Sequence, residues 1–178
     1  MRLLRDGRRT IGTGMKVLPF FLALLLSCAG LHAQEWLPIE REVEKATQSE
    51  KVTIVHFWAT WCPNCRAELS EGGWAKFMAA NPNANFVFVT ARSDIPGGPE
   101  LAKHGVGPQK NFTHLQHPNP SRRPGEEMTS FMGMRVGWMP ATWVFRNGRL
   151  RYALNYGEIR FPILQQLVND ATGNWDRP

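Results

Sequence analysis

The sequence predicts an α/β fold in which a mixed central sheet carries helices on both faces. Residues 51–59 and 85–91 are apolar, β-branched runs with little alternation, which is typical of strands buried on both faces. Each run precedes a helix-forming segment, and such alternation favours parallel pairing. Further along, Asn147 and Gly148 form a two-residue turn signal after a strand at residues 141–145, and the resulting hairpin adds an antiparallel pair.

The first half of the fold is predicted from hydrophobic spacing and glycine positions. Apolar residues recur at helical intervals within residues 38–50 and predict a surface helix. The strand at residues 51–59 leads into a helix that runs from the cysteines to Ala80. Gly72 and Gly73 lie inside that helix. Each glycine costs about 1 kcal/mol relative to alanine, so we expect a bend or break there.

The second half is predicted in the same way. In chain order we expect a strand at 85–91, a short helix within 96–107, a strand at 112–116, a proline-rich loop at 117–127, a short helix at 126–134, hairpin strands at 141–145 and 149–156, and a helix at 161–171. Pro162 suits the first turn of the final helix, because proline has no N–H to leave unpaired there.

Composition and charge narrow the function classes. A chain of 178 residues with 43% hydrophobic and 20% charged residues is long enough for one globular domain. Its formal charge of +6 is concentrated in residues 1–33, which hold five basic residues and one acidic residue. The rest of the chain is nearly neutral, so no phosphate-binding groove and no nucleic-acid partner are predicted.

The N-terminal 33 residues have the pattern of a secretory signal peptide. Basic residues precede an uncharged run at residues 17–31, which is short for a membrane span. Small residues follow, and cleavage after Ala33 would leave residues 34–178 as the exported domain. Export places that domain in the periplasm or another oxidising compartment, where disulfide chemistry persists.

Two features of this leader leave alternatives open. Met15 and Lys16 begin a compact signal of their own, so residues 1–14 can be an N-terminal extension. Cys28 lies in a stretch that loosely resembles a lipoprotein box, in which the cysteine would be acylated. The simpler interpretation is a small residue discarded with the leader, while an acylated Cys28 or an uncleaved leader would anchor the protein to a membrane.

Cys62 and Cys65 form the one closely spaced cysteine pair. Residues at i and i+3 share a helix face, close enough for two sulfurs to bond. A strand leading into a helix puts Cys62 near the N-cap, where N–H groups and the helix dipole stabilise a thiolate. Cys62 is therefore the predicted attacking thiol, and Cys65 the resolving thiol one turn deeper. Pro63 suits the first helical turn.

A structural staple, a zinc site and a haem attachment site are the alternatives for this pair. A loop this short removes little unfolded-state entropy, so a staple would contribute little. Zinc would need two more ligands, and His114 with His117 is the only other local pair. Haem attachment needs a histidine where Arg66 stands. A redox centre is the favoured interpretation.

Two motifs resemble a known family. The stretch FWATWCPNCRAE (residues 57–68) closely resembles the active-site segment of thioredoxin-fold proteins of the exported TlpA/ResA branch, which includes the DsbE/CcmG reductants of cytochrome c maturation. The stretch at residues 136–151 resembles the family's segment around its cis-proline and terminal hairpin. The resemblance covers most of residues 36–172, matches residues 92–135 only in outline, and implies a thioredoxin fold.

The resemblance also implies roles for individual residues. It implies a nucleophile at Cys62, a resolving thiol at Cys65, aromatic neighbours at Trp58 and Trp61, a potential-tuning pair at Pro63 and Asn64, a cis-proline at Pro140, and a substrate-binding backbone at Met139. His56 replaces the buried acid of thioredoxin and could move protons to and from the deeper thiol with a pKa nearer neutrality. A core histidine bonded to the backbone is the alternative for His56.

Two further positions are compared with the family. Glu68 matches a recurrent family glutamate, and an exposed first-turn helix residue is its alternative. Ala141 follows the predicted cis-proline where many relatives have a hydroxyl or acidic residue. This departure weakens a specific assignment to cytochrome c maturation.

A methionine-rich segment permits a copper hypothesis. Thioethers suit Cu(I), yet methionine more often fills core gaps or lines an adaptable peptide-binding surface. The four methionines, near His114 and His117, are Met128, Met132, Met134 and Met139. Arg122 and Arg123 in the proline-rich loop are interpreted as a solvated charge pair.

Together these patterns predict an exported thiol:disulfide oxidoreductase that acts on protein disulfides or thiols, as a reductant by family tendency. The resemblance implies a membrane thiol donor of the DsbD/CcdA kind, and neither a cofactor nor a metal is expected. A disulfide oxidase or isomerase, and a copper- or metal-handling module on the same fold, are the alternatives.

Overall fold

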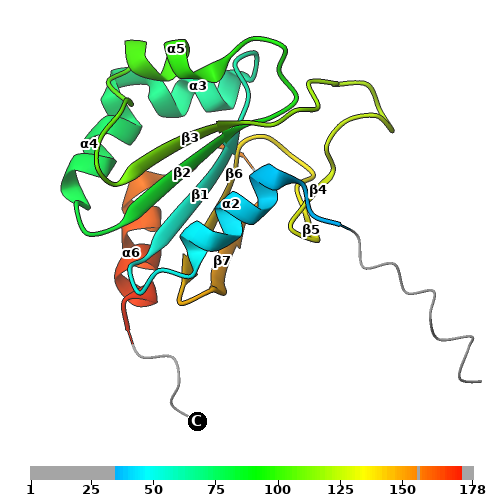
Figure 1. Ribbon diagram of the computed structural model, residues 1–178. Coiled ribbons are helices and arrows are strands. Elements are labelled where there is room, and N and C mark those ends of the chain that lie inside the picture. Colours follow the sequence, from blue (N-terminus) through cyan, green and yellow to red (C-terminus); the bar gives the residue numbers. More distant parts are fainter. Residues whose placement is uncertain (1–34, 156, 174–178) are drawn as a thin grey trace, which may run out of the picture. The chain divides into compact units, whose positions relative to one another are not determined.

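A five-stranded mixed sheet forms the centre of the computed structural model, which describes residues 35–155 and 157–173 (Figure 1). The strands lie in the order β3-β2-β1-β6-β7. β1 is parallel to β2 and β2 to β3, while β6 is antiparallel to both β1 and β7. Their bounds are β1 Thr53–Trp58, β2 Asn85–Thr90, β3 Phe112–Gln116, β6 Ala141–Arg146 and β7 Arg149–Leu154. The predicted mixed sheet and hairpin are confirmed.

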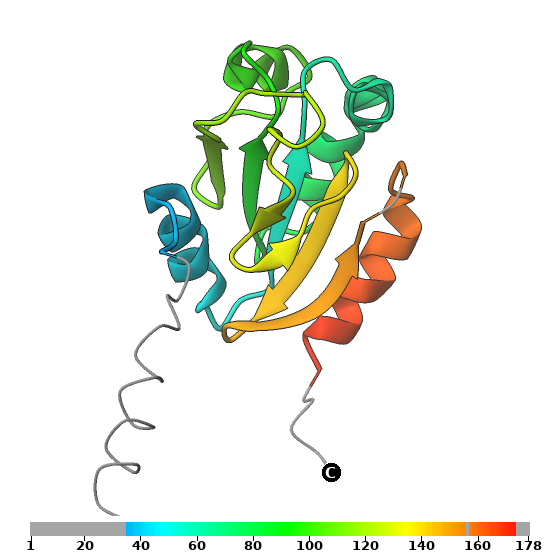
Figure 2. The same cartoon turned by 90° about the vertical axis from the view of Figure 1, so that its right-hand side faces the viewer.

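Helices cover both faces of this sheet, as predicted. Figure 2 shows α2 and α6 on opposite sides of the strands. The helices are α2 Pro38–Thr47, α3 Pro63–Leu69, α4 Gly73–Ala80, α5 Gly97–Lys103 and α6 Phe161–Ala171. Among residues 35–155 and 157–173, none of the helices combines the length and apolar character needed to cross a bilayer. The predicted signal peptide, its possible extension and Cys28 lie outside the described residues.

β1 is buried along its whole length and supplies both sides of the core. Alternate strand residues point to opposite faces. Ile54 and Trp58 join a cluster that includes residues of α3, α4 and α6. Val55 and Phe57 join a second cluster that includes Val43 of α2. The strand is therefore fixed from both faces, and so is the chain that leaves its carboxyl end.

The predicted break at the paired glycines is confirmed. α3 ends at Leu69, a 3-10 turn spans Ser70–Gly72, and α4 begins at Gly73. Gly72 has a φ of +70°, in the left-handed region that favours glycine. A Cβ on Gly73 would lie 2.5 Å from the carbonyl oxygen of Glu68. One glycine therefore supplies the turn, and the other allows α4 to pack closely beside α3.

The short helix predicted at residues 126–134 is wrong. The segment forms a two-stranded hairpin, with β4 at Ser130–Phe131 and β5 at Met134–Arg135. Met132 and Gly133 between the strands have φ values of 50° and 72°. Two successive left-handed residues make a tight hairpin turn and cannot continue a helix. Phe131 is fully buried against Phe57, with ring centroids 5.1 Å apart, and this contact holds the hairpin on the sheet.

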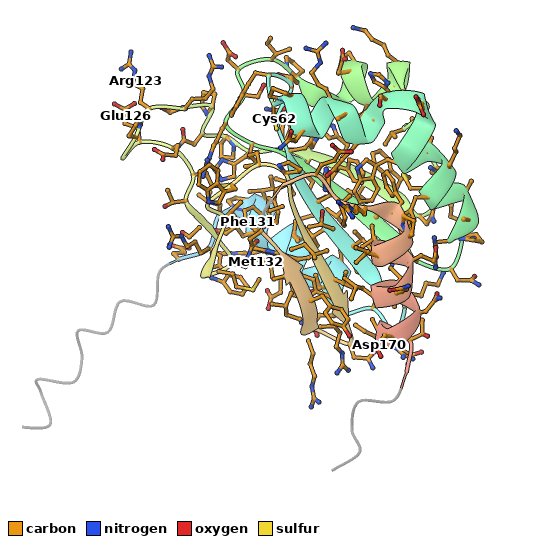
Figure 3. All side chains as sticks on the ribbon, turned by 180° about the vertical axis from the view of Figure 1, so that it is seen from behind. Cys62, Arg123, Glu126, Phe131, Met132 and Asp170 are labelled. Carbon is orange, nitrogen blue, oxygen red and sulfur yellow. The ribbon has the colours of Figure 1, made fainter. Side chains whose placement is uncertain are left out.

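The topology brings several loops to one edge of the sheet. The carboxyl ends of the parallel strands β1, β2 and β3 meet there, and β6 starts at the same edge because it runs antiparallel to β1. Figure 3 places Cys62 at this end of the molecule and Asp170 at the opposite end. Ligand sites of open α/β sheets form at the carboxyl ends of strands, so this edge is where the cysteine pair can act.

Glu40 links α2 to the hairpin. Its carboxylate is buried, and one oxygen accepts a hydrogen bond from the Leu37 N–H at 2.7 Å, which caps the first turn of the helix. The other oxygen accepts from the Met132 N–H at 2.5 Å. A single side chain thus satisfies two backbone donors from distant parts of the chain.

We expect Glu40→Ala to lower the free energy of unfolding by about 2–3 kcal/mol, because it leaves two backbone N–H groups without their charged acceptor. Urea unfolding of the two proteins measures the difference. Glu42→Ala, at an exposed position of the same helix, is the matched control and should change stability by about 0.5 kcal/mol or less. Equal effects of the two substitutions would contradict the role of Glu40.

Candidate active site

Cys62 lies at the N-cap of α3, as predicted from the strand-to-helix context. Its Sγ accepts a hydrogen bond from the Cys65 N–H at 3.3 Å and, as a thiol, donates to the Met139 carbonyl at 3.4 Å. Pro63 occupies the first helical position, where its missing N–H costs nothing. Pro63 and Asn64 are exposed, whereas both cysteines are buried and in the thiol form.

The two thiols have opposite acid–base character. The hydrogen bond from the Cys65 side chain lowers the pKa of Cys62 to about 7, against the opposing effect of burial and with help from the N–H groups of Cys65 and Asn64. Burial raises the pKa of Cys65, and the adjoining Cys62 thiolate raises it further. Cys62 is therefore the thiol of the pair that ionises first as the pH rises toward neutrality.

The segment before β6 forms the second wall of the site. The peptide bond between Met139 and Pro140 is cis. The Met139 carbonyl faces the Cys62 sulfur, and β6 begins two residues later at Ala141. This arrangement brings the two sequence motifs, 77 residues apart, into direct contact.

His56 and Glu68 form a buried polar pair beneath the cysteines. His56 Nε2 lies 3.4 Å from Glu68 Oε2, and both side chains are 2% exposed or less. The carboxyl group also accepts hydrogen bonds from the Ile159 N–H at 2.6 Å and the Trp74 indole at 2.9 Å. On its other side, His56 Nδ1 lies 2.9 Å from Thr142 Oγ1. Glu68 is thus a core residue, and the alternative of an exposed first-turn glutamate is wrong.

Burial keeps both members of this pair neutral near pH 7. It raises the pKa of Glu68 to about 8, although the N–H groups of Ile159 and Trp74 act in the opposite direction. It lowers the pKa of His56 to about 3, so the expected histidine pKa near neutrality is wrong. The contact is therefore one between a protonated carboxyl and a neutral imidazole. In this state the Glu68 carboxyl O–H is directed at His56 Nε2, which accepts, and the neutral imidazole carries its one proton on Nδ1, where it can donate to Thr142 Oγ1.

Exposed apolar side chains surround the buried cysteines. Trp61, which directly precedes Cys62, is 40% exposed. Trp138, which directly precedes Met139, is 64% exposed. The indole N–H of Trp61 donates to the Arg92 carbonyl at 2.6 Å. The guanidinium of Arg122 lies 5.3 Å from the centre of the Trp61 ring, so Arg122 is more than a solvated charge.

The methionines of residues 128–139 have packing roles. Met128 is buried in the second core cluster. The other three methionines are partly buried and pack against that cluster. His114 bonds to the Thr90 hydroxyl at 2.9 Å, and His117 accepts from the Asn119 N–H at 3.1 Å. Within residues 35–155 and 157–173, no three His, Cys, Asp or Glu side chains are grouped as a metal site requires.

Three neighbours of the site were not predicted. Thr142 and Trp74 contact the buried pair, and Arg92 contacts Trp61. Thr142 is separated from His56 by 86 positions and Arg92 from Trp61 by 31. The one local signal for Arg92 is its place directly after an apolar strand, where parallel α/β sheets collect functional loops.

A family model for a thioredoxin-like domain matches residues 39–172. The chain belongs to the thioredoxin-like family. The predicted thioredoxin fold and the resemblance drawn from the two motifs are therefore confirmed.

Relatives of this thioredoxin-like chain include secreted mycobacterial proteins. The soluble secreted antigen MPT53 of Mycobacterium tuberculosis is 32% identical over 71 residues, which cover 39% of this chain and 38% of the relative. The chain thus matches about two fifths of the length of this curated relative. A secreted M. tuberculosis disulfide oxidoreductase homologous to E. coli DsbE is 25% identical, with a TM-score of 0.51 over 70% of this chain and 85% of the other. MTB DsbF is also 25% identical, with a TM-score of 0.51 over 70% of this chain and 83% of the other.

The raised pKa of Glu68 predicts a pH-dependent stability. The folded protein keeps the Glu68 proton up to about pH 8, whereas the unfolded chain loses it above about 4.5. Between these values the folded state binds more protons, so its stability falls as pH rises. We expect the stability of the parent relative to Glu68→Gln to fall by about 1.4 kcal/mol per pH unit in this window.

Urea unfolding of both proteins at a series of pH values measures this difference. Glu71→Gln removes a carboxylate from an exposed position just beyond α3 and controls for the loss of one negative charge. A stability difference between the parent and Glu68→Gln that stays constant with pH would show that Glu68 is ionised in the folded protein.

Proposed function

We propose that this chain is an exported thiol:disulfide oxidoreductase that acts on protein disulfides through Cys62 and Cys65. The observation that carries the proposal is the pairing of a helix-capped thiol, whose pKa is lowered to about 7, with a buried thiol whose pKa is raised. One of the two is ready to attack, and the other holds its proton until a mixed disulfide has formed. Structural neighbours that include a disulfide oxidoreductase support the enzyme class.

In the reductive direction the cycle has two exchange steps. The Cys62 thiolate attacks one sulfur of the substrate disulfide, which forms a mixed disulfide and releases the other substrate sulfur as a thiolate. Cys65 then loses its proton and attacks the Cys62 sulfur, which forms the intramolecular disulfide and releases the second substrate thiolate. Two electrons pass to the substrate, and the protein is left oxidised.

The buried pair of Glu68 and His56 is positioned to handle the Cys65 proton. Burial and the Cys62 sulfur are the larger causes of the raised Cys65 pKa, and Glu68 raises it further once it is ionised, which indicates that the two groups lie within electrostatic reach. A carboxyl group with a pKa of about 8 is mostly protonated at pH 7 but close to its titration range, and a group with a pKa near the working pH is an efficient proton carrier. Thr142 orients the His56 ring through Nδ1, and Nε2 of that ring faces the carboxyl group.

Substrate binding is assigned to the surface around Cys62. An extended substrate segment can pair with the Met139 backbone in the manner of an added β-strand, with Pro140 fixing the approach to the sulfur. The exposed rings of Trp61 and Trp138 offer apolar contact on either side. Pro63 and Asn64 are exposed beside the nucleophile and would contact the partner as well.

The reductive direction is supported by the thiol chemistry of Cys62. Stabilising the thiolate stabilises the reduced protein and so makes it a stronger oxidant. The strong oxidase DsbA lowers its thiol pKa to about 3.5, whereas reductive thioredoxin has a value of about 7. The Cys62 pKa of about 7 matches the reductant. A membrane thiol donor of the DsbD/CcdA kind would then return electrons to the oxidised pair.

Export is the remaining part of the proposal. The residue pattern at 1–33 is that of a signal peptide, which would leave residues 34–178 as the thioredoxin-like domain. The mycobacterial relatives MPT53 and the DsbE homologue are described as secreted. Anchoring through Cys28 or an uncleaved leader is the alternative to release, and N-terminal sequencing of the exported protein distinguishes them.

The attacking role of Cys62 and the resolving role of Cys65 predict different results in a trapping experiment. Cys65→Ser should accumulate mixed disulfides with substrate proteins, because the resolving thiol is missing, while Cys62→Ser should trap at least about tenfold less, since its remaining thiol is buried and protonated. Non-reducing electrophoresis of the purified variants, incubated with disulfide-containing proteins, gives the readout. Equal trapping by the two variants would reverse or remove the role assignment.

The direction of electron flow predicts a reduction potential. Equilibration of the protein with glutathione couples should give a value nearer to the about −270 mV of thioredoxin than to the about −120 mV of the strong oxidase DsbA. The fraction of reduced protein can be read from the alkylation of its thiols. A potential close to that of DsbA would identify the protein as an oxidase or isomerase instead of a reductant. The expected trapping result would not change.

A further inference from the structure

Arg92 occupies a strained position at the functional edge of the sheet. It follows β2 and Ala91 directly, and its φ of 51° lies in the left-handed region that non-glycine residues rarely adopt. Its backbone carbonyl accepts the indole N–H of Trp61, the residue before the nucleophile. Residues kept in such conformations are held by their surroundings and gather at functional sites.

The guanidinium of Arg92 spans three carbonyl groups of one segment. Nε and Nη2 both donate to the Met128 carbonyl, at 2.9 and 2.6 Å. Nη2 also donates to the Val136 carbonyl at 2.8 Å, and Nη1 to the Gly137 carbonyl at 3.4 Å. The three acceptors lie on both sides of the β4–β5 hairpin. One side chain thus closes the base of this hairpin.

The segment that Arg92 holds leads directly to the substrate-binding backbone. Val136 and Gly137 are followed by the exposed Trp138 and by Met139, whose carbonyl contacts the Cys62 sulfur. Through its carbonyl Arg92 contacts Trp61, which precedes the nucleophile, and through its guanidinium it contacts the segment that leads to Met139. Arg92 thus links Trp61 to residues 136–139, which precede Pro140.

We propose that Arg92 is a positioning residue for substrate binding, which sets the place of residues 136–139 relative to Cys62. The proposal rests on the proposed oxidoreductase function. A planar guanidinium can reach three carbonyls at once, whereas the compact ammonium of a lysine cannot reproduce this geometry. Without Arg92 these carbonyls lose their donor, and the segment is free to shift. Because a substrate segment would bind along this backbone, such a shift is expected to weaken substrate binding while leaving the Cys62 thiolate, which the start of α3 stabilises, in place.

Loss of the Arg92 contacts is expected to affect protein substrates and small disulfides differently. A protein disulfide must lie along the Met139 backbone to reach Cys62, so it depends on the position of that segment. A small aromatic disulfide needs only the thiolate, which is stabilised by the start of α3 and not by Arg92. Positioning by Arg92 is therefore expected to affect protein substrates selectively.

Single-turnover reduction of insulin and of 5,5′-dithiobis(2-nitrobenzoate) by the pre-reduced protein tests this expectation. For Arg92→Ala we expect the concentration of insulin that gives the half-maximal rate to rise about tenfold, with the maximal rate and the small-disulfide rate constant each changing less than about threefold. Arg92→Lys should fall between the parent and Arg92→Ala, because it keeps the charge and loses the planar donors.

Arg123→Ala is the matched control. Arg123 lies in the loop that precedes the β4–β5 hairpin, its side chain is 82% exposed, and Figure 3 shows it projecting away from Cys62. Its kinetics should equal those of the parent for both substrates. Urea unfolding of each variant reports on folding, and Arg92→Lys carries the test where Arg92→Ala is unfolded.

Two outcomes would overturn the positioning role: an unchanged half-maximal insulin concentration in both Arg92 variants, or an equal loss toward both disulfides. The second would make Arg92 a general structural residue. Failure of the parent protein itself to reduce either disulfide is a distinct result, which would overturn the proposed function and remove the basis of this inference.

Discussion

The junction between β1 and α3 is the constraint on which the rest of the structure depends. β1 is buried on both faces, so its carboxyl end has a fixed position, and the helix starts at Cys62 four residues later. The backbone N–H groups at that start can stabilise a negative sulfur only because the strand holds them there. Burial of the deeper sulfur of Cys65 follows from the same helix, since one turn carries it into the core.

A single local geometry therefore gives two thiols with opposite properties. The same burial that suppresses ionisation of Cys65 also raises the pKa of Glu68 and lowers that of His56. The interior beneath the cysteines is thus uncharged near neutral pH, although it contains several groups that can titrate. Of the two thiols and this buried pair, Cys62, at the N-cap of α3, is the group that ionises near neutral pH.

Local sequence patterns were sufficient for the strands, the glycine break, the cysteine pair and the terminal hairpin, because each depends on neighbours in the chain. They failed for the hairpin around Met132, where helix-compatible residues are held as strands by contacts with Phe57 and Glu40. They also failed for Arg92, since its carbonyl acceptors are 36 to 45 positions away. Interactions over such separations leave no periodic trace in the sequence.

The long-range bonds around the site also set an order of assembly. His56 meets Thr142, Glu68 meets Ile159, and Glu40 meets Met132, over separations of 86 to 92 positions. A domain folds as a unit, so these pairings form only after the chain as far as Ile159 has been synthesised. The two cysteines are therefore synthesised well before the residues of the final third of the chain that help to enclose and orient the site. Until the final third of the chain arrives, the nascent protein carries a reactive thiol pair without the enclosure that distinguishes one thiol from the other.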